Sequence, residues 1–215
     1  MQIEFVAGPL AATVSPVARI VDQDALPADL DALLVESARA ARFTGKAGQA
    51  HDGFVAREGG IVRMALAGAG DAKAKDRTAA LERAGAALTA KFLTSGESTL
   101  TLDLTGTKLS ATDIAAVLLG ARLRAWRYDI YRTKLADDHK PSLKTLRVAG
   151  APEGTEAAWA TEAALAEGVE FTRELVTEPA NVIYPASFVE RAQQRLAGTG
   201  VKVRALGRDE MAALG

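Results

Sequence analysis

The sequence predicts an α/β domain followed by a linking helix and the first elements of a second α/β domain. Over the first 150 residues, short stretches rich in β-branched residues alternate with amphipathic helical stretches, which is typical of layered α/β folds. A break at "APEG" then precedes one long helical stretch. The expected division is an N-terminal domain at 1–153, a linking helix and junction at 154–180, and an incomplete second domain at 181–215.

Six stretches of the first domain have the composition or the alternation of β-strands. They are QIEFVA, VARIV, GFVAR, IVRMALA, STLTLDL and SLKTLRVAG. Between the third and the fourth, Gly59 and Gly60 can supply the positive φ that a tight reversal requires. This pair predicts a β-hairpin.

Three amphipathic helices are predicted between these strands, within 27–43, 75–93 and 110–126. The first is expected to place one face on the sheet, formed by Leu30, Leu33, Leu34, Ser37, Ala38 and Ala41. The third begins at Ser110, which has the spacing of a capping box with Asp113.

The linking helix is predicted from Thr155 to Thr177. Its apolar positions form two adjacent stripes, a face too wide for one neighbour, so the helix is expected to pack between two bodies. Gly168 in its interior costs about 1 kcal/mol relative to alanine, and we expect another backbone to approach closely there. Pro179 ends the helix.

The last segment begins with a helix from Pro185 to about Gly198. "VKVRAL" is then predicted as a strand and "GRDEMAALG" as the start of another helix. One strand with its helices cannot bury a sheet face. We therefore expect the sequence to stop inside a domain and to be a truncated or incomplete form of a longer protein.

The composition excludes several kinds of chemistry. Twenty-six basic residues nearly balance 27 acidic ones, so no net field favours nucleic acid or an anionic membrane. The chain has no cysteine and only two histidines, His51 and His139, which excludes thiolate and cysteine-based metal sites. Neither a signal sequence nor an apolar run of about 20 residues is present, so the expected compartment is the cytoplasm.

Gly68 and Gly70 stand after a predicted strand and before a helix with Lys73 and Lys75. This order suits a phosphate at a helix N-terminus. The third glycine of a dinucleotide fingerprint and the Walker lysine are absent, so a plain strand-to-helix turn is the favoured interpretation.

Basic and aromatic residues are interleaved from the end of the third helix onward, a composition found on nucleic-acid surfaces. They are Arg122, Arg124, Trp126, Arg127, Tyr128, Tyr131, Arg132 and Lys134. The balanced charge favours the other interpretation, in which the aromatic residues anchor the helix end and the arginines face water or acidic neighbours.

Two weaker candidates remain. Asp137, Asp138 and His139 could ligate a divalent ion, but adjacent loop residues rarely converge on one metal, so a solvated loop is expected. His51 has no nearby serine or carboxylate motif, and a structural or exposed role is expected for it.

The stretch "AEGVEFTRELVTEPANVIYPASFVERA", from Ala166 to Ala192, resembles the junction between the two domains of the leucyl (cytosol) aminopeptidase family of metallo-exopeptidases. Weaker similarities occur upstream in the family's order, in FTGKAGQ, ALAGAG, LERAGAAL and LLGARLRAWRYDIYRTK. Thr177 stands where the family often has asparagine. Tyr184 replaces the threonine that would cap the next helix, which should weaken its start by about 1 kcal/mol.

The resemblance implies a macro-like N-terminal domain with a mixed sheet flanked by helices, a linking helix and the opening of a catalytic domain. Family members are cytoplasmic hexamers that remove N-terminal residues from peptides with two divalent ions, zinc or manganese. The family's ligand segments, "GKG…FDSGG" and "NTDAEGR", do not occur in these 215 residues. No catalytic, cofactor-binding or metal-binding role is therefore assigned to any residue, and the chain alone is expected to be inactive.

Two alternative functions stay open from the residues. The first is a free-standing macro-like module that holds a nucleotide near Gly68 and Gly70. The second is a DNA-contacting surface that extends from Arg122 to Lys134.

Overall fold

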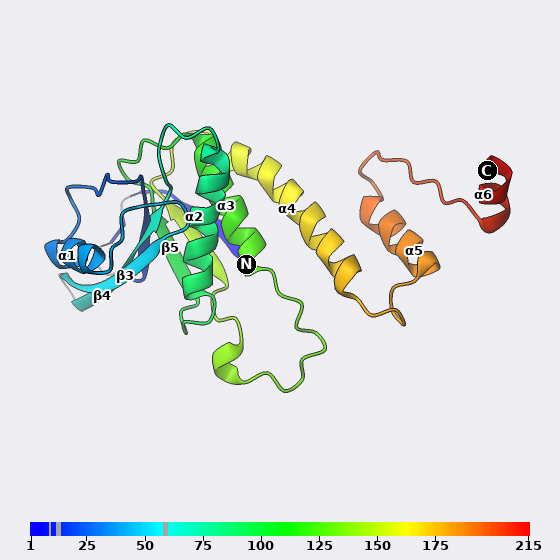
Figure 1. Cartoon of the computed structure of the whole chain (residues 1–215), viewed down its shortest axis with the longest axis horizontal. Coiled ribbons are helices and arrows are strands. Elements are labelled where there is room, and N and C mark those ends of the chain that lie inside the picture. Colours follow the sequence, from blue (N-terminus) through cyan, green and yellow to red (C-terminus); the bar gives the residue numbers. More distant parts are fainter. Residues whose placement is uncertain (9, 12–13, 58–59) are drawn as a thin grey trace. The chain divides into compact units, whose positions relative to one another are not determined.

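The computed structural model describes residues 1–8, 10–11, 14–57 and 60–215. These residues group into two compact units, Met1–Glu170 and Phe171–Gly215. The first unit contains the whole β-sheet and the three helices that cover it (Figure 1).

The first unit is built on a six-stranded mixed sheet with the order β1-β6-β5-β2-β4-β3. The strands are β1 Gln2–Val6, β2 Val17–Val21, β3 Ala50–Arg57, β4 Gly60–Gly68, β5 Thr99–Asp103 and β6 Thr145–Ala149. All neighbouring strands are parallel except β3 and β4, which are antiparallel. The predicted fold class and the six strands predicted in the first domain are confirmed, whereas Gly59 of the predicted hairpin turn lies outside the described residues.

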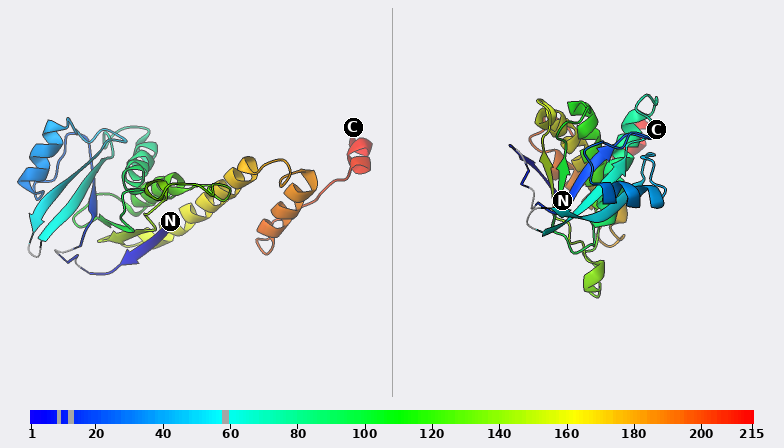
Figure 2. Two further views of the ribbon diagram at one scale, coloured as in Figure 1. Left: turned by 90° about the horizontal axis from the view of Figure 1, so that it is seen from below. Right: turned by 90° about the vertical axis from the view of Figure 1, so that its left-hand side faces the viewer.

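Helices cover the two faces of the sheet (Figure 2). Helix α1, Ala32–Ala40, packs on one face through Leu34 and Ala38. Helices α2, Arg77–Phe92, and α3, Ala111–Ala125, cover the other face. The larger core lies on that side, between the apolar sides of α2 and α3 and the inward residues of β5 and β6.

The predicted face of the first helix is wrong at two positions. Leu33 and Ala41 are exposed, whereas Leu34 and Ala38 are buried. Consecutive helical residues point about 100° apart, and the side of α1 that meets the sheet includes Leu34 but not Leu33. Ala41 lies beyond the last helical residue, Ala40.

Helices α2 and α3 contact each other backbone to backbone at two glycines. A Cβ atom added to Gly85 would lie 1.9 Å from the carbonyl oxygen of Val117, and one added to Gly120 would lie 1.9 Å from that of Glu82. The expectation that Gly168 marks such an approach is wrong, because an added Cβ there meets no heavy atom within 4 Å outside its own helix.

The long helix α4 spans Thr155–Thr177, as predicted. Of its residues only Thr155 and Ala166 are buried, while Leu165 and Val176 from the predicted apolar face are exposed. The expectation that this face packs between two bodies stays a prediction.

The second unit contains the end of α4 and the helices α5, Pro185–Leu196, and α6, Arg208–Leu214. The hydroxyl of Ser187 accepts the backbone N–H of Tyr184 at 2.9 Å, so one bond of a capping box is present although tyrosine replaces the usual cap. The predicted strand at 201–206 is wrong: these residues lie in no sheet. Strand propensity needs a neighbouring strand to pair with, and this unit offers none among its described residues.

Candidate functional site

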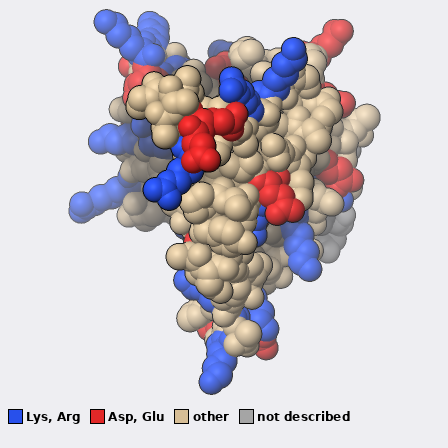
Figure 3. Space-filling view, turned by 90° about the vertical axis from the view of Figure 1, so that its right-hand side faces the viewer, with Lys and Arg blue, Asp and Glu red and all other residues tan. Residues whose placement is uncertain are grey.

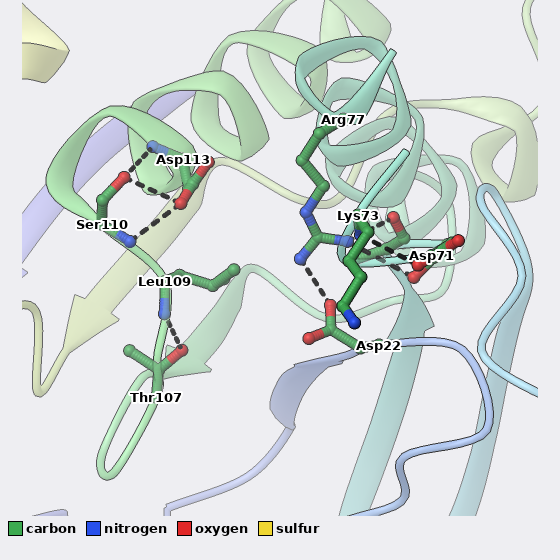
Figure 4. Close-up of polar contacts among 10 residues, drawn as sticks. Asp22, Asp71, Lys73, Arg77, Thr107, Leu109, Ser110 and Asp113 are labelled. Carbon is green, nitrogen blue, oxygen red and sulfur yellow. Dashed lines mark hydrogen bonds and ion pairs between the residues drawn. The ribbon is translucent and has the colours of Figure 1, made fainter. Parts of the chain in front are cut away.

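A large hollow of the first unit lies at the carboxyl ends of β2 and β5. After β2 the chain continues to β3 and β4 on one side of the sheet order, and after β5 it continues to β6 on the other side. Neighbouring parallel strands whose connections leave in opposite directions form a topological switch point, where α/β proteins commonly bind ligands. A cleft of about 860 Å³ lies there, lined by the segments after β2, β4 and β5 (Figure 4).

Arg77, at the start of α2, fixes one wall of this cleft (Figure 4). Its Nη1 donates to the carbonyl oxygens of Ala69 at 2.8 Å and Gly70 at 3.3 Å, and its Nη2 donates to the carboxylate of Asp22. The guanidinium thereby links the ends of β2 and β4 to α2. Its charge is neutralised by Asp22, so Arg77 acts as a structural link.

The opposite wall is the start of α3. The Oδ2 atom of Asp113 accepts the backbone N–H of Ser110 at 3.0 Å, and the Oγ atom of Ser110 accepts the N–H of Asp113 at 3.2 Å, which confirms the predicted capping box (Figure 4). The carboxylate of Asp113 already interacts with the positive end of this helix. A ligand anion at the same helix end would face that charge.

The turn after β4 has no backbone donor to offer at its two glycines. The N–H groups of Gly68, Ala69 and Gly70 donate to the carbonyl oxygens of Gln49, Val21 and Gly45 at 2.8, 2.8 and 2.9 Å. A Cβ atom on Gly68 would lie 2.1 Å from the carbonyl oxygen of Lys46. The glycines therefore allow the loop around Lys46 to pack closely, and the plain strand-to-helix turn accounts for them better than a phosphate site.

The basic and aromatic segment after α3 is largely paired with acidic groups. Arg122 makes two hydrogen bonds to Glu170, at 3.0 and 2.9 Å, and this contact, despite opposing desolvation, holds the pKa of Arg122 above its ordinary value. Arg127 and Arg132 both pair with Asp129.

The rings of Trp126 and Tyr128 stack with centroids 6.0 Å apart. Basic and acidic side chains are interspersed on the face in Figure 3. The ion pairs of Arg122, Arg127 and Arg132 agree with the interpretation in which the arginines face acidic neighbours.

His51 forms a hydrogen bond with Ser37. The hydroxyl oxygen of Ser37 lies 2.9 Å from Nε2 of His51 and 2.9 Å from the carbonyl oxygen of Leu34, and the tautomer of His51 decides whether the ring or the hydroxyl donates. Burial lowers the pKa of His51, which favours the neutral ring. The expected structural role of His51 stays a prediction.

The acidic loop residues do not gather into a metal site. Asp137, Asp138 and His139 form a short, exposed 3₁₀ turn, and Lys140 donates to the carboxylate of Asp137 at 2.6 Å. Within residues 1–8, 10–11, 14–57 and 60–215, no three histidine, cysteine, aspartate or glutamate side chains are grouped so that they could hold a metal ion. The described residues therefore do not fit the metal pair that the family resemblance implies.

Two charged groups in the first unit were not indicated by any local sequence pattern. The carboxylate of Asp52 on β3 accepts from Nε and Nη2 of Arg63 at 2.8 and 2.7 Å, and Nζ of Lys91 lies 2.6 Å from its other oxygen. Arg19 on β2 donates to Asp29 at 2.7 Å. Both groups join segments that only the sheet topology brings together.

No helix within the described part of the chain combines the length and the apolar character needed to cross a bilayer.

Comparisons with known proteins agree with this fold. Residues 12–135 match the model of the cytosol aminopeptidase family, N-terminal domain. A probable cytosol aminopeptidase of Caulobacter vibrioides is 39% identical over 176 residues, which cover 81% of this chain and 34% of the relative. One from Sinorhizobium fredii is 35% identical over 192 residues, covering 87% of this chain and 38% of the relative. The chain thus spans little more than a third of the length of these relatives.

Two solved structures have the same fold. A mutant of tomato leucine aminopeptidase aligns with 99% of this chain and 46% of its own, with a TM-score of 0.71 and 21% identity. The bottromycin maturation enzyme BotP in complex with Mn aligns with 95% of this chain and 40% of its own, with a TM-score of 0.69 and 27% identity. Because the family model matches more than half of the sequence, the chain belongs to the cytosol aminopeptidase family and contains its N-terminal domain.

Proposed function

We propose that this chain is the non-catalytic N-terminal part of a two-metal leucyl aminopeptidase that removes N-terminal amino acids from peptides in the cytoplasm. In this proposal the chain supports assembly into a homo-oligomer, a hexamer, and shapes access to the active sites. The observation that supports this proposal is the match to the family model, together with the share of each relative that the match covers. Relatives named cytosol aminopeptidases are nearly three times as long as the matched part.

In this proposal the described residues have a non-catalytic role. Two divalent ions, manganese or zinc, would activate water in the catalytic part of the parent protein. The BotP enzyme, which has the same fold over this region, was solved in complex with Mn. No residue of this chain is given a step in the chemistry.

Exposed apolar side chains in the second unit support a role in assembly. Val176, Tyr184, Phe188 and Leu214 are each about half exposed or more in a unit of only 45 residues, from Phe171 to Gly215. Apolar surface of this kind is usually covered by a partner or by another part of the same protein. We propose that the remainder of the aminopeptidase and neighbouring subunits cover it.

A chimera tests this proposal. The matched region of the Caulobacter relative is replaced by residues 1–192 of this chain, which end with the last residue of the junction motif. We expect the chimera to assemble into a hexamer and to hydrolyse leucine p-nitroanilide, as measured by light scattering and by release of nitroaniline. The intact relative is the positive control.

The relative without its matched region is the negative control, and we expect it to lose the oligomeric state. A chimera that folds by circular dichroism but remains as monomeric and inactive as this control would contradict the proposed role in assembly.

A further inference from the structure

Arg19 occupies an unusual place for an arginine. It lies on β2, in the interior of the sheet, and only 15% of its side chain is exposed. It lines both the cleft of about 860 Å³ and an adjoining hollow of about 380 Å³. Charged groups are seldom placed in such a position without paired partners, because removing them from water is costly.

The partner of Arg19 is a group at the surface. Nη1 donates to Asp29 at 2.7 Å, and Nη2 donates to the carbonyl oxygen of Thr105 at 3.3 Å. The side chain of Asp29 is 70% exposed and belongs to the irregular segment between β2 and α1. The hydrogen bond from Arg19 lowers the pKa of Asp29, with a smaller contribution from the charge of Arg57. A shielded cation is thus neutralised by a carboxylate that water can reach.

A second cation stands beside this pair. Arg57, at the end of β3, lines the adjoining hollow together with Arg19 and Asp29. Arg77 cannot bind an anion in the same way, because its guanidinium already donates hydrogen bonds to Asp22 and to two carbonyl oxygens. The larger cleft is also lined by Lys108, an exposed residue of the loop after β5, so its positive charge is contributed by Arg19 and Lys108, with Arg57 beside Arg19 in the adjoining hollow.

We infer that this cleft binds a small molecule through one carboxylate or phosphate group, which takes the place of Asp29 on Arg19 and is also attracted by Arg57. Asp29 acts as a built-in competitor that keeps Arg19 neutralised when the cleft is empty. An incoming anion forms two charge-assisted hydrogen bonds with a guanidinium that the sheet already holds in position.

The other walls of the cleft restrict the chemistry of the rest of the bound small molecule. Thr105, Thr107 and Leu109 offer hydroxyl groups and an apolar side chain along the loop after β5. Asp103 and Asp113 line the same cleft, and each already accepts a backbone N–H, from Thr105 and Ser110. Their charges oppose a second anionic group, so the molecule carries a single anionic group on a neutral, polar body.

Removing the charge of Asp29, which competes with a bound anion for Arg19, tests whether the cleft binds an anion. In the Asp29→Asn variant of the full 215-residue chain, inorganic phosphate or malonate is titrated at constant ionic strength while the arginine Nε–H signals are followed by NMR. We expect saturable shifts with an affinity about twofold to fivefold higher than in the parent chain, the size of one partly exposed ion pair. A response to only one probe identifies the class of anion.

Asp24→Asn is the matched control, because it removes the same charge from the same segment at a residue with φ +57° that asparagine tolerates. It should leave the parent affinity unchanged. Arg19→Gln should abolish the saturable shifts, and if that variant does not fold, the comparison of Asp29→Asn with Asp24→Asn still decides. No saturable response to either probe in Asp29→Asn, or an equal gain in Asp24→Asn, would overturn the proposal.

Discussion

Gly85→Ala and Gly120→Ala should each lower the free energy of unfolding by about 3 kcal/mol or more. In both variants the new methyl group would lie 1.9 Å from a backbone carbonyl oxygen of the facing helix. Backbone atoms cannot rotate away as a flexible side chain can, so α2 and α3 must separate. Separation would open the core on that side of the sheet, which includes Ala84, Val117 and Ala121.

Urea denaturation followed by tryptophan fluorescence measures this effect. Both tryptophans, Trp126 and Trp159, belong to the unit Met1–Glu170 and therefore report on the sheet and its helices. Gly168→Ala is the matched control, a glycine in a helix interior whose added Cβ meets no atom within 4 Å outside its own helix. It should raise stability by about 0.5 to 1 kcal/mol. Equal, small effects at all three glycines would contradict the backbone contact between α2 and α3.

Asp52→Asn should lower the free energy of unfolding by about 2 kcal/mol or more. Only 15% of the Asp52 side chain is exposed, and its carboxylate is the shared partner of Arg63 and Lys91. The substitution leaves two cations near the sheet with no anion between them. It also weakens the link between the β3–β4 hairpin and α2, which carries Lys91.

The same variant has a signature in its pH dependence. Burial by itself raises the pKa of Asp52, but the hydrogen bonds and charges of Lys91 and Arg63 outweigh it and hold the pKa below the ordinary value of 3.8. A carboxyl with a lowered folded pKa stabilises the fold fully above the unfolded value and loses that contribution as the pH falls through the folded one. The parent should lose stability as the pH falls below about 4, and Asp52→Asn should show a shallower decline.

Asp76→Asn provides the control for charge removal from an ion pair. Asp76 pairs with Arg83, but both side chains are at least half exposed, so we expect a loss below about 0.5 kcal/mol. Denaturation curves at several pH values compare the three proteins. A loss in Asp52→Asn no larger than in Asp76→Asn would show that the Asp52 ion pairs contribute no more than an exposed pair.

The elements of the first unit were predictable because their signals are local. The alternation in "STLTLDL", the capping box at Ser110 and the helical spacing from Thr155 to Thr177 each depend on residues within one segment. The strand predicted at 201–206 is wrong because a strand must pair with a neighbouring strand, and the segment's own sequence cannot supply one.

The charged groups around the cleft could not be predicted in the same way. Arg19 meets Thr105 only because β2 and β5 are neighbours in the sheet, although 86 residues separate the two. The interior glycines of the helices look alike in the sequence, and only the packing of α2 on α3 distinguishes Gly85 and Gly120 from Gly168.

Our central proposal is that this polypeptide is part of an aminopeptidase whose chemistry takes place outside these 215 residues. Its most direct test is hydrolysis of leucine p-nitroanilide by the purified chain, assayed with Mn²⁺ or Zn²⁺ beside the intact Caulobacter relative. We expect a rate equal to the blank without protein, while the relative releases nitroaniline. Hydrolysis that rises in proportion to the concentration of this chain and saturates with substrate would contradict the claim.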